Sequence, residues 1–156
     1  MSRFAPYYPT ADHVVDLMLQ LGGLQPGERM FDLGSGDGRI VIRATQQYGA
    51  DATGIELDPD LVRQSRARIE ELGLSERARI VEGDFLHQNY AAADLVTLYL
   101  TPSAVSELSP ILQGQLKPGA RVVVNSFDFG ELWTPSEEMT ITDIRIGRRM
   151  LYLYRR

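Results

Sequence analysis

One stretch of the chain decides its fold: Asp32-Leu33-Gly34-Ser35-Gly36-Asp37-Gly38, which follows the short apolar run 30–33 and precedes a helical pattern over 38–48. Glycines at alternating positions let the backbone turn sharply and approach a ligand closely. The first N–H groups of the helix that follows have no partners within the helix, so they are available to an anionic group. Strand, glycine loop and helix in this order predict a ligand-binding turn at the edge of a sheet.

The spacing of these glycines differs from that of the dinucleotide-binding fingerprint. The chain has Gly-x-Gly-x-Gly, and Arg39 stands where the fingerprint has its third glycine. Asp32 and Asp37 flank the loop. Two carboxylates at this place would repel a pyrophosphate and attract a cation. The loop therefore favours a ligand with a positive centre.

Acidic residues also stand near the ends of the next two predicted strands. Glu56 lies near the end of the strand predicted over 52–57, where a carboxylate can accept hydrogen bonds from both hydroxyls of a ribose. Asp84 follows the next strand and can accept a hydrogen bond from an adenine amino group, with Phe85 or Leu57 packing on the ring. These positions suit a nucleoside that carries a cation, and S-adenosylmethionine combines adenosine with a sulfonium and an ammonium group.

Hydrophobic periodicity predicts the remaining elements. Thr10 is the expected N-cap of the first helix, and Asp58 with Pro59 begins the third. Ser109 and Pro110 predict a break and a new N-cap inside the fourth helix. We expect helices over 11–21, 38–48, 59–72 and 103–116, and strands over 30–33, 52–57, 78–82, 94–100, 120–126, 139–146 and 148–154.

The alternation of strands and helices predicts an α/β fold. We expect a three-layer, Rossmann-like, doubly wound sheet that is mostly parallel, with one antiparallel strand contributed by a C-terminal hairpin. Ligands of such sheets bind beyond the carboxyl ends of the strands. The chain has 156 residues and no repeat or linker, which indicates a single domain.

The charge of the chain is unevenly distributed. Its 16 basic and 21 acidic residues give a net charge of −5, but all 21 acids and only 11 of the bases lie in the first 144 residues. An acidic body of this kind disfavours broad binding to nucleic acid. The last twelve residues predict a solvated edge strand whose charges oppose aggregation, or else a surface that contacts a partner. They hold five arginines: Arg145, Arg148, Arg149, Arg155 and Arg156.

Several classes of protein are excluded by what the sequence lacks. Without cysteine there is no disulfide scaffold, thiolate zinc site or cysteine nucleophile. No apolar run approaches the length that spans a bilayer, and the first residues lack the apolar region of a signal peptide, so we expect a cytoplasmic protein. His13 and His87 are isolated, and no cluster has metal-ligand spacing, so no metal is expected.

The glycine loop, Glu56 and Asp84, in this order, resemble the nucleoside-binding signature of class I (seven-β-strand) S-adenosylmethionine-dependent methyltransferases. A narrower likeness, to the small archaeal protein-lysine methyltransferases and to the mitochondrial group that methylates the ATP synthase c-subunit, implies a lysine ε-amino group of a protein as the methyl acceptor. It is carried by Pro6-Tyr7-Tyr8-Pro9-Thr10, 32–41, Gly54-Ile55-Glu56-Leu57-Asp58-Pro59, Leu98-Tyr99-Leu100-Thr101, and Ser126-Phe127 followed by Trp133-Thr134-Pro135.

The resemblance also implies how one methyltransferase domain, 1–156, is divided. Residues 1–22 would form a segment and a helix that cover the substrate and cofactor, and 28–156 would form the cofactor-binding core. The expected cofactor, S-adenosyl-L-methionine, would be bound by Tyr8, Thr10, Asp32, Gly34, Ser35, Gly36, Asp37, Gly38, Glu56, Leu57, Asp84, Phe85 and Tyr99.

Methyl transfer is an in-line displacement, so positioning supplies much of its rate. Deprotonating a lysine of pKa about 10.4 at pH 7 costs roughly 4.6 kcal/mol, which desolvation in an aromatic pocket can partly offset, so a dedicated base is optional. Aromatic rings also attract alkylammonium groups. Packing alone is the alternative role for Tyr99 and Trp133, and turn packing or a plain N-cap for Tyr8 and Thr10. We expect Tyr99, Thr101 and Tyr7 to position the substrate, and Phe127, Asp128 and Trp133 to bind it.

Two other functions stay open at this point. One is methylation of a small molecule or RNA on the same fold, and the other is a cofactor-binding module that needs a partner subunit. A chain of 156 residues leaves no separate recognition domain, so the site should be open, which suits an exposed side chain of a protein substrate. The sequence carries no signal for the oligomeric state.

Overall fold

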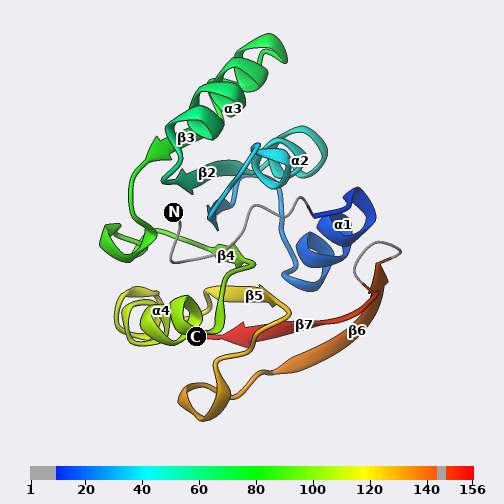
Figure 1. Ribbon diagram of the computed structural model, residues 1–156, viewed down its shortest axis with the longest axis vertical. Helices are drawn as coiled ribbons and strands as arrows, with labels where there is room; N and C mark the ends of the chain where they lie inside the picture. Colours follow the sequence, from blue (N-terminus) through cyan, green and yellow to red (C-terminus); the bar gives the residue numbers. More distant parts are fainter. Residues whose placement is uncertain (1–9, 144–146) are drawn as a thin grey trace.

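The computed structural model describes residues 10–143 and 147–156, and it forms a sheet with helices on both faces (Figure 1). Within these ranges the strand order is β3-β2-β1-β4-β5-β7-β6. The strands are β1 (Arg29–Leu33), β2 (Asp51–Glu56), β3 (Ala78–Glu82), β4 (Leu95–Leu98), β5 (Arg121–Asn125), β6 (Glu137–Asp143) and β7 (Gly147–Arg155). The helices are α1 (Asp12–Leu21), α2 (Arg39–Tyr48), α3 (Pro59–Glu71) and α4 (Pro102–Gln115), with short 3₁₀ turns η1 (Phe85–His87) and η2 (Gly130–Leu132).

The directions of the strands confirm the predicted sheet. Strands β1 to β5 pair in parallel, whereas β7 runs antiparallel to both β5 and β6. The chain begins at the centre of the sheet with β1, moves outward to β3, and returns to the other side of β1 with β4. This reversal makes the carboxyl ends of β1 and β4 the switch point, where ligands of doubly wound sheets bind.

The apolar core lies on both faces of the sheet, as three layers require. One buried cluster joins the sheet to α1, α2 and α3, with Met18 and Val41 among its members. The other joins the sheet to α4 through residues such as Leu108 and Leu112. Strand β4 is buried along its whole length. Burial on both faces is why the central strands read as continuous apolar runs.

The prediction that the arginine-rich end forms an edge strand is wrong. Strand β7 lies between β5 and β6, so β6 is the edge of the sheet on this side. After β5 the chain passes through η2 to the outer position and then returns to pair with β5. The pairing of β5 with β7 ends at Asn125 opposite Leu151, so the first residues of β7 extend past the end of β5.

The predicted break in the fourth helix is also wrong. Helix α4 runs continuously with Pro110 inside it, and Thr101 is its N-cap with Pro102 at its first position. A proline within a helix removes one backbone hydrogen bond, whose acceptor here would be the carbonyl of Ser106. Pro110 and Ser106 both lie on the exposed face, where water can satisfy that carbonyl. Burial of Leu108 and Leu112 on the other face keeps the helix in one piece.

Other element boundaries differ from the prediction by a few residues. The N-cap of α1 is Ala11, without a side-chain hydrogen bond, so Thr10 does not cap this helix. Asp58 caps α3 as predicted, accepting hydrogen bonds from the backbone N–H groups of Asp60 and Leu61. Strand β4 ends at Leu98, which leaves Tyr99 in the loop that follows. Within the described ranges, no helix has the length and apolar character needed to cross a bilayer.

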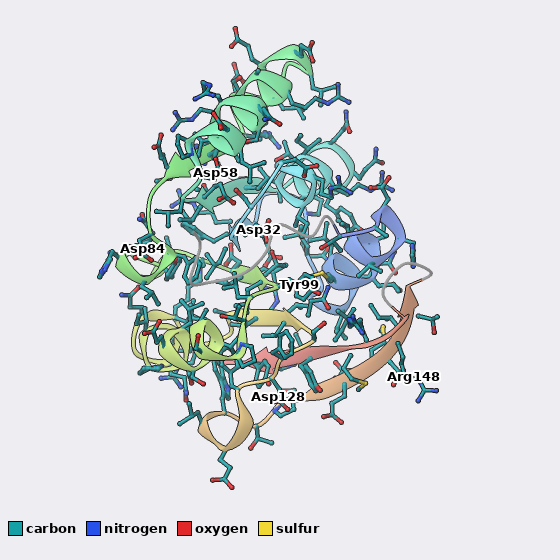
Figure 2. The ribbon with its side chains drawn as sticks, in the orientation of Figure 1. Asp32, Asp58, Asp84, Tyr99, Asp128 and Arg148 are labelled. Atoms are coloured by element: carbon teal, nitrogen blue, oxygen red, sulfur yellow. The ribbon has the colours of Figure 1, made fainter. Side chains whose placement is uncertain are left out.

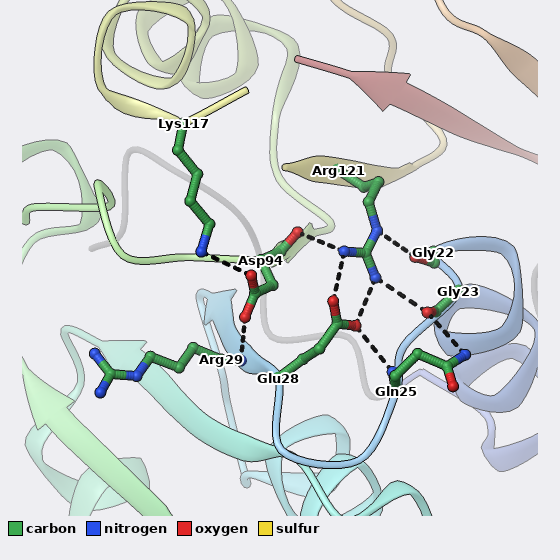
Figure 3. Close-up of polar contacts among 8 residues, drawn as sticks. All are labelled: Gly22, Gly23, Gln25, Glu28, Arg29, Asp94, Lys117 and Arg121. Carbon is green, nitrogen blue, oxygen red and sulfur yellow. Dashed lines mark hydrogen bonds and ion pairs between the residues drawn. The ribbon is translucent and has the colours of Figure 1, made fainter. Parts of the chain in front are cut away.

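A polar network joins the elements at the amino ends of the central strands, at the opposite end of these strands from the glycine loop (Figure 3). Arg121, the first residue of β5, forms an ion pair of 2.7 Å with Glu28 and donates to the carbonyls of Gly22 and Gly23 at the end of α1. Asp94 accepts from the backbone N–H of Arg29 at 2.8 Å and pairs with Lys117. Arg121 therefore ties α1, β1 and β5 together at the amino ends of the strands.

Candidate functional site

The glycine loop has the backbone geometry that its sequence predicts. Gly34, Gly36 and Gly38 have φ angles of 75°, 58° and 82°, a region that residues with a Cβ rarely adopt. The backbone N–H groups of Gly34 and Ser35 both donate to the carbonyl of Ile55, which fixes the loop against β2. Gly38 then serves as the N-cap of α2. The loop is thus a rigid turn between β1 and α2 at the switch point.

Glu56 supports this loop from the end of β2. One of its carboxylate oxygens accepts from the N–H of Gly36 at 2.7 Å, and the other accepts from the N–H groups of Leu57 and Asp58 at 3.0 Å. A carboxylate has about four acceptor positions. Three are therefore used by the protein, and a ribose that engaged both hydroxyls would have to displace one of these backbone bonds.

Asp32, at the end of β1, is buried beneath the loop. Its side chain is 3% exposed and accepts a hydrogen bond of 2.9 Å from the Thr97 hydroxyl of β4. Burial raises the pKa of Asp32 to about 8, and the negative charges of Glu56 and Asp37 act in the same direction. A carboxyl group in this setting gains most from a nearby positive charge. Thr97 was not among the predicted site residues, because nothing in the apolar run around it marks it.

The predicted nucleoside contacts differ in how accessible they are. Asp84 caps η1 by accepting from the N–H of Leu86 at 2.9 Å, and it is partly exposed. Leu57 is 48% exposed beside the end of β2, whereas the Phe85 ring is buried in the core. Leu57 is therefore the better placed of the two to pack on an adenine. In Figure 2, Asp84 and Tyr99 lie on either side of Asp32, as the strand order requires.

Arg39 links the loop to the N-terminal segment. Its guanidinium pairs with Asp37 at 2.6 Å, and its Nη1 donates to the Thr10 carbonyl at 3.0 Å. The residue that replaces the third glycine of the fingerprint therefore places Thr10 beside the loop. From the sequence, Arg39 was marked as a departure from a motif without a role of its own. Tyr7 and Tyr8, predicted to lie across the cofactor, are outside the described residues.

A cavity of about 420 Å³ opens at the carboxyl ends of β4 and β5. It brings together two predicted site residues, Tyr99 and Phe127, that are far apart in the sequence. The contribution of β7 to this cavity was not predicted, because only the pairing of β5 with β7 brings that strand here. The lining residues are Tyr99, Ser126, Phe127, Arg148, Arg149 and Met150.

Ser126 has an unusual conformation in the wall of this cavity. Its φ is 76°, and among the described residues it is the one non-glycine residue with positive φ. Its N–H donates to the Met150 carbonyl at 2.8 Å, and its hydroxyl donates to the side chain of the buried Asn125 at 2.8 Å. Residues in this region persist where the surroundings hold them, often at functional sites. The turn fixes the direction in which Phe127 leaves β5.

Three other predicted acceptor-side residues make structural contacts and do not line this cavity. Thr101 caps α4, and Asp128 accepts from the N–H of Gly130 at 3.1 Å. Trp133 stacks on Phe129 with ring centres 5.3 Å apart and also contacts Tyr154. The substrate roles predicted for Thr101, Asp128 and Trp133 stay predictions.

Residues 32–137 match the family model described as the ANTKMT methyltransferase domain. The match covers more than half of the chain and contains the glycine loop, Glu56, Asp84 and the first three residues of the cavity wall. The chain belongs to this methyltransferase family. The fold and the resemblance predicted from the sequence are thereby confirmed.

Individual members and neighbours are similar over most of the chain. A protein-lysine N-methyltransferase of Saccharolobus islandicus is 36% identical over 150 residues, which are 96% of this chain and 92% of the relative. The lysine N-methyltransferase of Mus musculus that acts on the ATP synthase c-subunit is 34% identical over 130 residues, 83% of this chain and 51% of the relative. This chain thus spans about half the length of the mouse methyltransferase.

A solved structure extends the comparison to the fold. The crystal structure of an RNA methyltransferase from Salinibacter ruber, in complex with S-adenosyl-L-homocysteine, is 42% identical. The two structures superpose with a TM-score of 0.86. The superposition covers 95% of this ANTKMT-family chain and 93% of the chain from Salinibacter ruber. Family members and neighbours with the same core are therefore described with different methyl acceptors.

Proposed function

We propose that this chain is a methyltransferase that uses S-adenosylmethionine to methylate lysine ε-amino groups of a protein substrate. The observation that carries the proposal is the placement of Asp32, Glu56 and Asp84 at the ends of adjacent strands, next to the cavity that Tyr99 and Phe127 line. Acids there suit a cationic nucleoside, and aromatic walls suit an alkylamine. The lysine methyltransferases among its relatives support the choice of acceptor.

The residues around the loop match the chemistry of this cofactor. Asp32 would face the positive groups, because it is the buried carboxyl whose raised pKa a nearby cation would lower. Glu56 would accept from the ribose, Asp84 from the adenine amino group, and Leu57 would cover the ring. When bound, S-adenosylmethionine supplies an electrophilic methyl group on a sulfonium. The three acids would thus hold the cationic end, the ribose and the adenine of the ligand.

The cavity would act on the lysine by removing water from it. Its amine must be neutral to act as a nucleophile, which costs roughly 4.6 kcal/mol at pH 7 for an unperturbed lysine. Transfer from water to a site with the walls of Tyr99, Phe127 and Met150 lowers the pKa of an amine. The hydroxyl of Tyr99, at this wall, could accept a hydrogen bond from the substrate ammonium.

The RNA methyltransferase with 42% identity makes RNA the second candidate acceptor. The charge of this chain favours protein, since a net charge of −5 opposes the approach of a polyanion. A cytoplasmic location stays a prediction from the sequence, and a cofactor-binding module that needs a partner subunit stays an alternative.

Incubating the full chain with tritiated S-adenosylmethionine and cell lysate tests the acceptor class. The labelled lysate is divided into protein, RNA and small molecules, and the protein fraction is resolved by gel fluorography. We expect discrete labelled protein bands that disappear after protease treatment and persist after nuclease treatment. Label confined to RNA or to small molecules would contradict the proposal.

A matched pair of variants controls this experiment. Asp84→Asn changes the acid predicted to meet the adenine amino group, whereas Glu82→Gln changes an exposed acid at the end of the same strand. We expect the label to fall in the first variant, because an amide oxygen accepts a weaker hydrogen bond than a carboxylate, and to stay at the wild-type level in the second. Equal melting temperatures would show that both variants are folded.

A further inference from the structure

The cavity has two chemically different ends. Tyr99 and Phe127, with Met150, give it aromatic and apolar walls, while Arg148 and Arg149 add two basic residues to the lining. In Figure 2, Tyr99 lies beside Asp32 at the centre of the sheet, and Arg148 lies on the outer part of the β6–β7 hairpin. Arg148, and with it the next residue of the same strand, Arg149, thus belongs to the end that is farther from the glycine loop.

A regular strand holds the backbone of these arginines. Both precede the last pair between β5 and β7, Asn125 with Leu151, so they extend past β5. Strand β6 still pairs with them, Ile141 with Arg149 and Thr142 with Arg148. His13 of α1 lies 3.4 Å from the Thr142 carbonyl on the outer strand. The two guanidinium groups are therefore presented by a paired strand and not by a loose tail.

Among the side chains that the structure describes, neither arginine has a carboxylate partner. Arg149 Nη1 donates to the carbonyl of Arg148 at 2.9 Å, and Arg148 is exposed. Several other arginines of the described ranges pair with acids of this chain. Examples are Arg39 with Asp37, Arg43 with Asp16, Arg79 with Asp51, Arg121 with Glu28 and Arg155 with Glu137.

We propose that Arg148 and Arg149 select lysines that have an aspartate or glutamate close by on the substrate protein. This inference rests on the proposed function, because it takes the methyl acceptor to be a lysine. The target lysine would occupy the aromatic end, and the guanidinium groups at the outer end would receive the carboxylate of its neighbour. Guanidinium groups bind carboxylates through paired, charge-assisted hydrogen bonds.

Charge is the reason to expect an acidic neighbour. Two guanidinium groups repel an approaching ammonium, and a carboxylate beside the lysine offsets that repulsion. A phosphate would satisfy the same two arginines, but a nucleic acid would bring a run of phosphates against a body whose first 144 residues carry 21 acids and 11 bases. A single carboxylate on a protein substrate is therefore repelled less by the acidic body of this chain than a nucleic acid would be.

Mapping the methylated sites in a lysate tests this inference. The full chain, the double variant Arg148→Gln/Arg149→Gln, and the control Arg155→Gln/Arg156→Gln are each incubated with lysate and deuterated S-adenosylmethionine. Labelled lysines are then located by tandem mass spectrometry. For the wild type and the control, we expect acids within three residues of labelled lysines more often than around other lysines of the same proteins. For the double variant, we expect that enrichment to vanish.

Synthetic peptides copied from a mapped site measure how strongly the enzyme prefers a lysine with a flanking acid. We expect the wild type to prefer a peptide with the flanking acid over its glutamine counterpart by about 3- to 10-fold in kcat/KM, with a loss of preference at high salt. The double variant should methylate the two peptides equally well, and at least as fast as the wild type methylates the glutamine peptide, because the repulsion of the ammonium is removed. A preference that survives in the double variant, or an equal loss on both peptides, would overturn the inference.

The outcomes separate this inference from the function on which it rests. Labelled lysines without acidic enrichment would overturn the role of the arginines and leave lysine methylation standing. Labelled RNA without labelled lysine, abolished in the double variant, would overturn both and assign the arginines to phosphate.

Discussion

Asp32 is a residue that we predict to serve ligand binding at the expense of stability. It is buried, its two acidic neighbours are Glu56 and Asp37, and its hydrogen bond comes from Thr97. Its pKa of about 8 in the folded state lies above the ordinary value of 3.8, so folding retains a proton that the unfolded chain releases. This residue therefore makes stability fall as pH rises from about 4 to about 8.

Asp32→Asn separates these two effects. The amide keeps an oxygen for the Thr97 hydroxyl but cannot ionise, so the stability of the variant should not fall over this pH window on account of residue 32. We expect the free energy of unfolding in urea to rise for the variant relative to the wild type as the pH increases. At pH 8 the variant should be the more stable of the two. Its affinity for S-adenosylmethionine should be lower. Parallel pH profiles for both proteins would contradict the buried, protonated state.

Glu56 is predicted to act on both the ligand and the fold. Because its carboxylate accepts three backbone hydrogen bonds, Glu56→Ala should lower the free energy of unfolding by about 1–3 kcal/mol. Cofactor binding should weaken by roughly 1.5–3 kcal/mol through loss of a charge-assisted hydrogen bond. Urea unfolding and titration calorimetry measure the two effects. An unchanged affinity would refute the role in ribose binding.

At this scale the sequence predicts which acids matter but not what they contact. Asp32, Glu56 and Asp84 could be named because each lies in the last residues of a recognisable strand or just beyond them. The backbone bonds of Glu56 and the contact of Asp32 with Thr97 depend on how three strands align, and no local pattern records that alignment. Arg39 was visible only as a missing glycine.

Among the elements, the β6–β7 hairpin and α4 have features that local sequence patterns do not predict, because tertiary packing decides them. A hairpin could be predicted from two strands without a helix between them, but either strand could have paired with β5. The choice of β7 buries Leu151 and Leu153 and brings Arg148 to the cavity. In α4 the local signal of Pro110 was overridden by the apolar residues on the other face.

Arg121 is predicted to stabilise the elements at the amino ends of the central strands, away from the candidate site. Arg121→Gln removes an ion pair that is 12% exposed on the arginine side, together with hydrogen bonds to α1. We expect a loss of about 2–4 kcal/mol in the free energy of unfolding, since Glu28 is left without its partner. Cofactor affinity measured well below the melting temperature should not change.

The pH dependence of this loss has a definite sign. Hydrogen bonding from Arg121 lowers the pKa of Glu28 below 4.5, so the stabilisation is present above that pH and disappears as the pH falls through the folded-state pKa. Arg63→Gln is the control, because its ion pair with Asp60 is 71% exposed on the arginine side and should contribute little. Equal destabilisation by the two substitutions would contradict the structural role of Arg121.

At the scale of the whole molecule, the residues that the structure describes form a cofactor-binding sheet and the helices that cover it. Its described helices and strands all belong to that sheet and its two covering layers, and the cavity proposed to receive the acceptor is formed by loops and by the hairpin. Length and charge already predicted an open site and a protein acceptor. They could not indicate where the acceptor lies, because that place depends on β7 returning beside β5.

Locating the transferred methyl group tests the central claim most directly. The full chain is incubated with lysate and deuterated S-adenosylmethionine, and protein, RNA and small molecules are then analysed by mass spectrometry. We expect deuterated methyl groups on the ε-nitrogen of lysines in a limited set of proteins, and less of this label when Asp84→Asn replaces the wild type. Deuterated methyl groups found only on RNA bases or metabolites, with unlabelled lysines, would contradict lysine methylation.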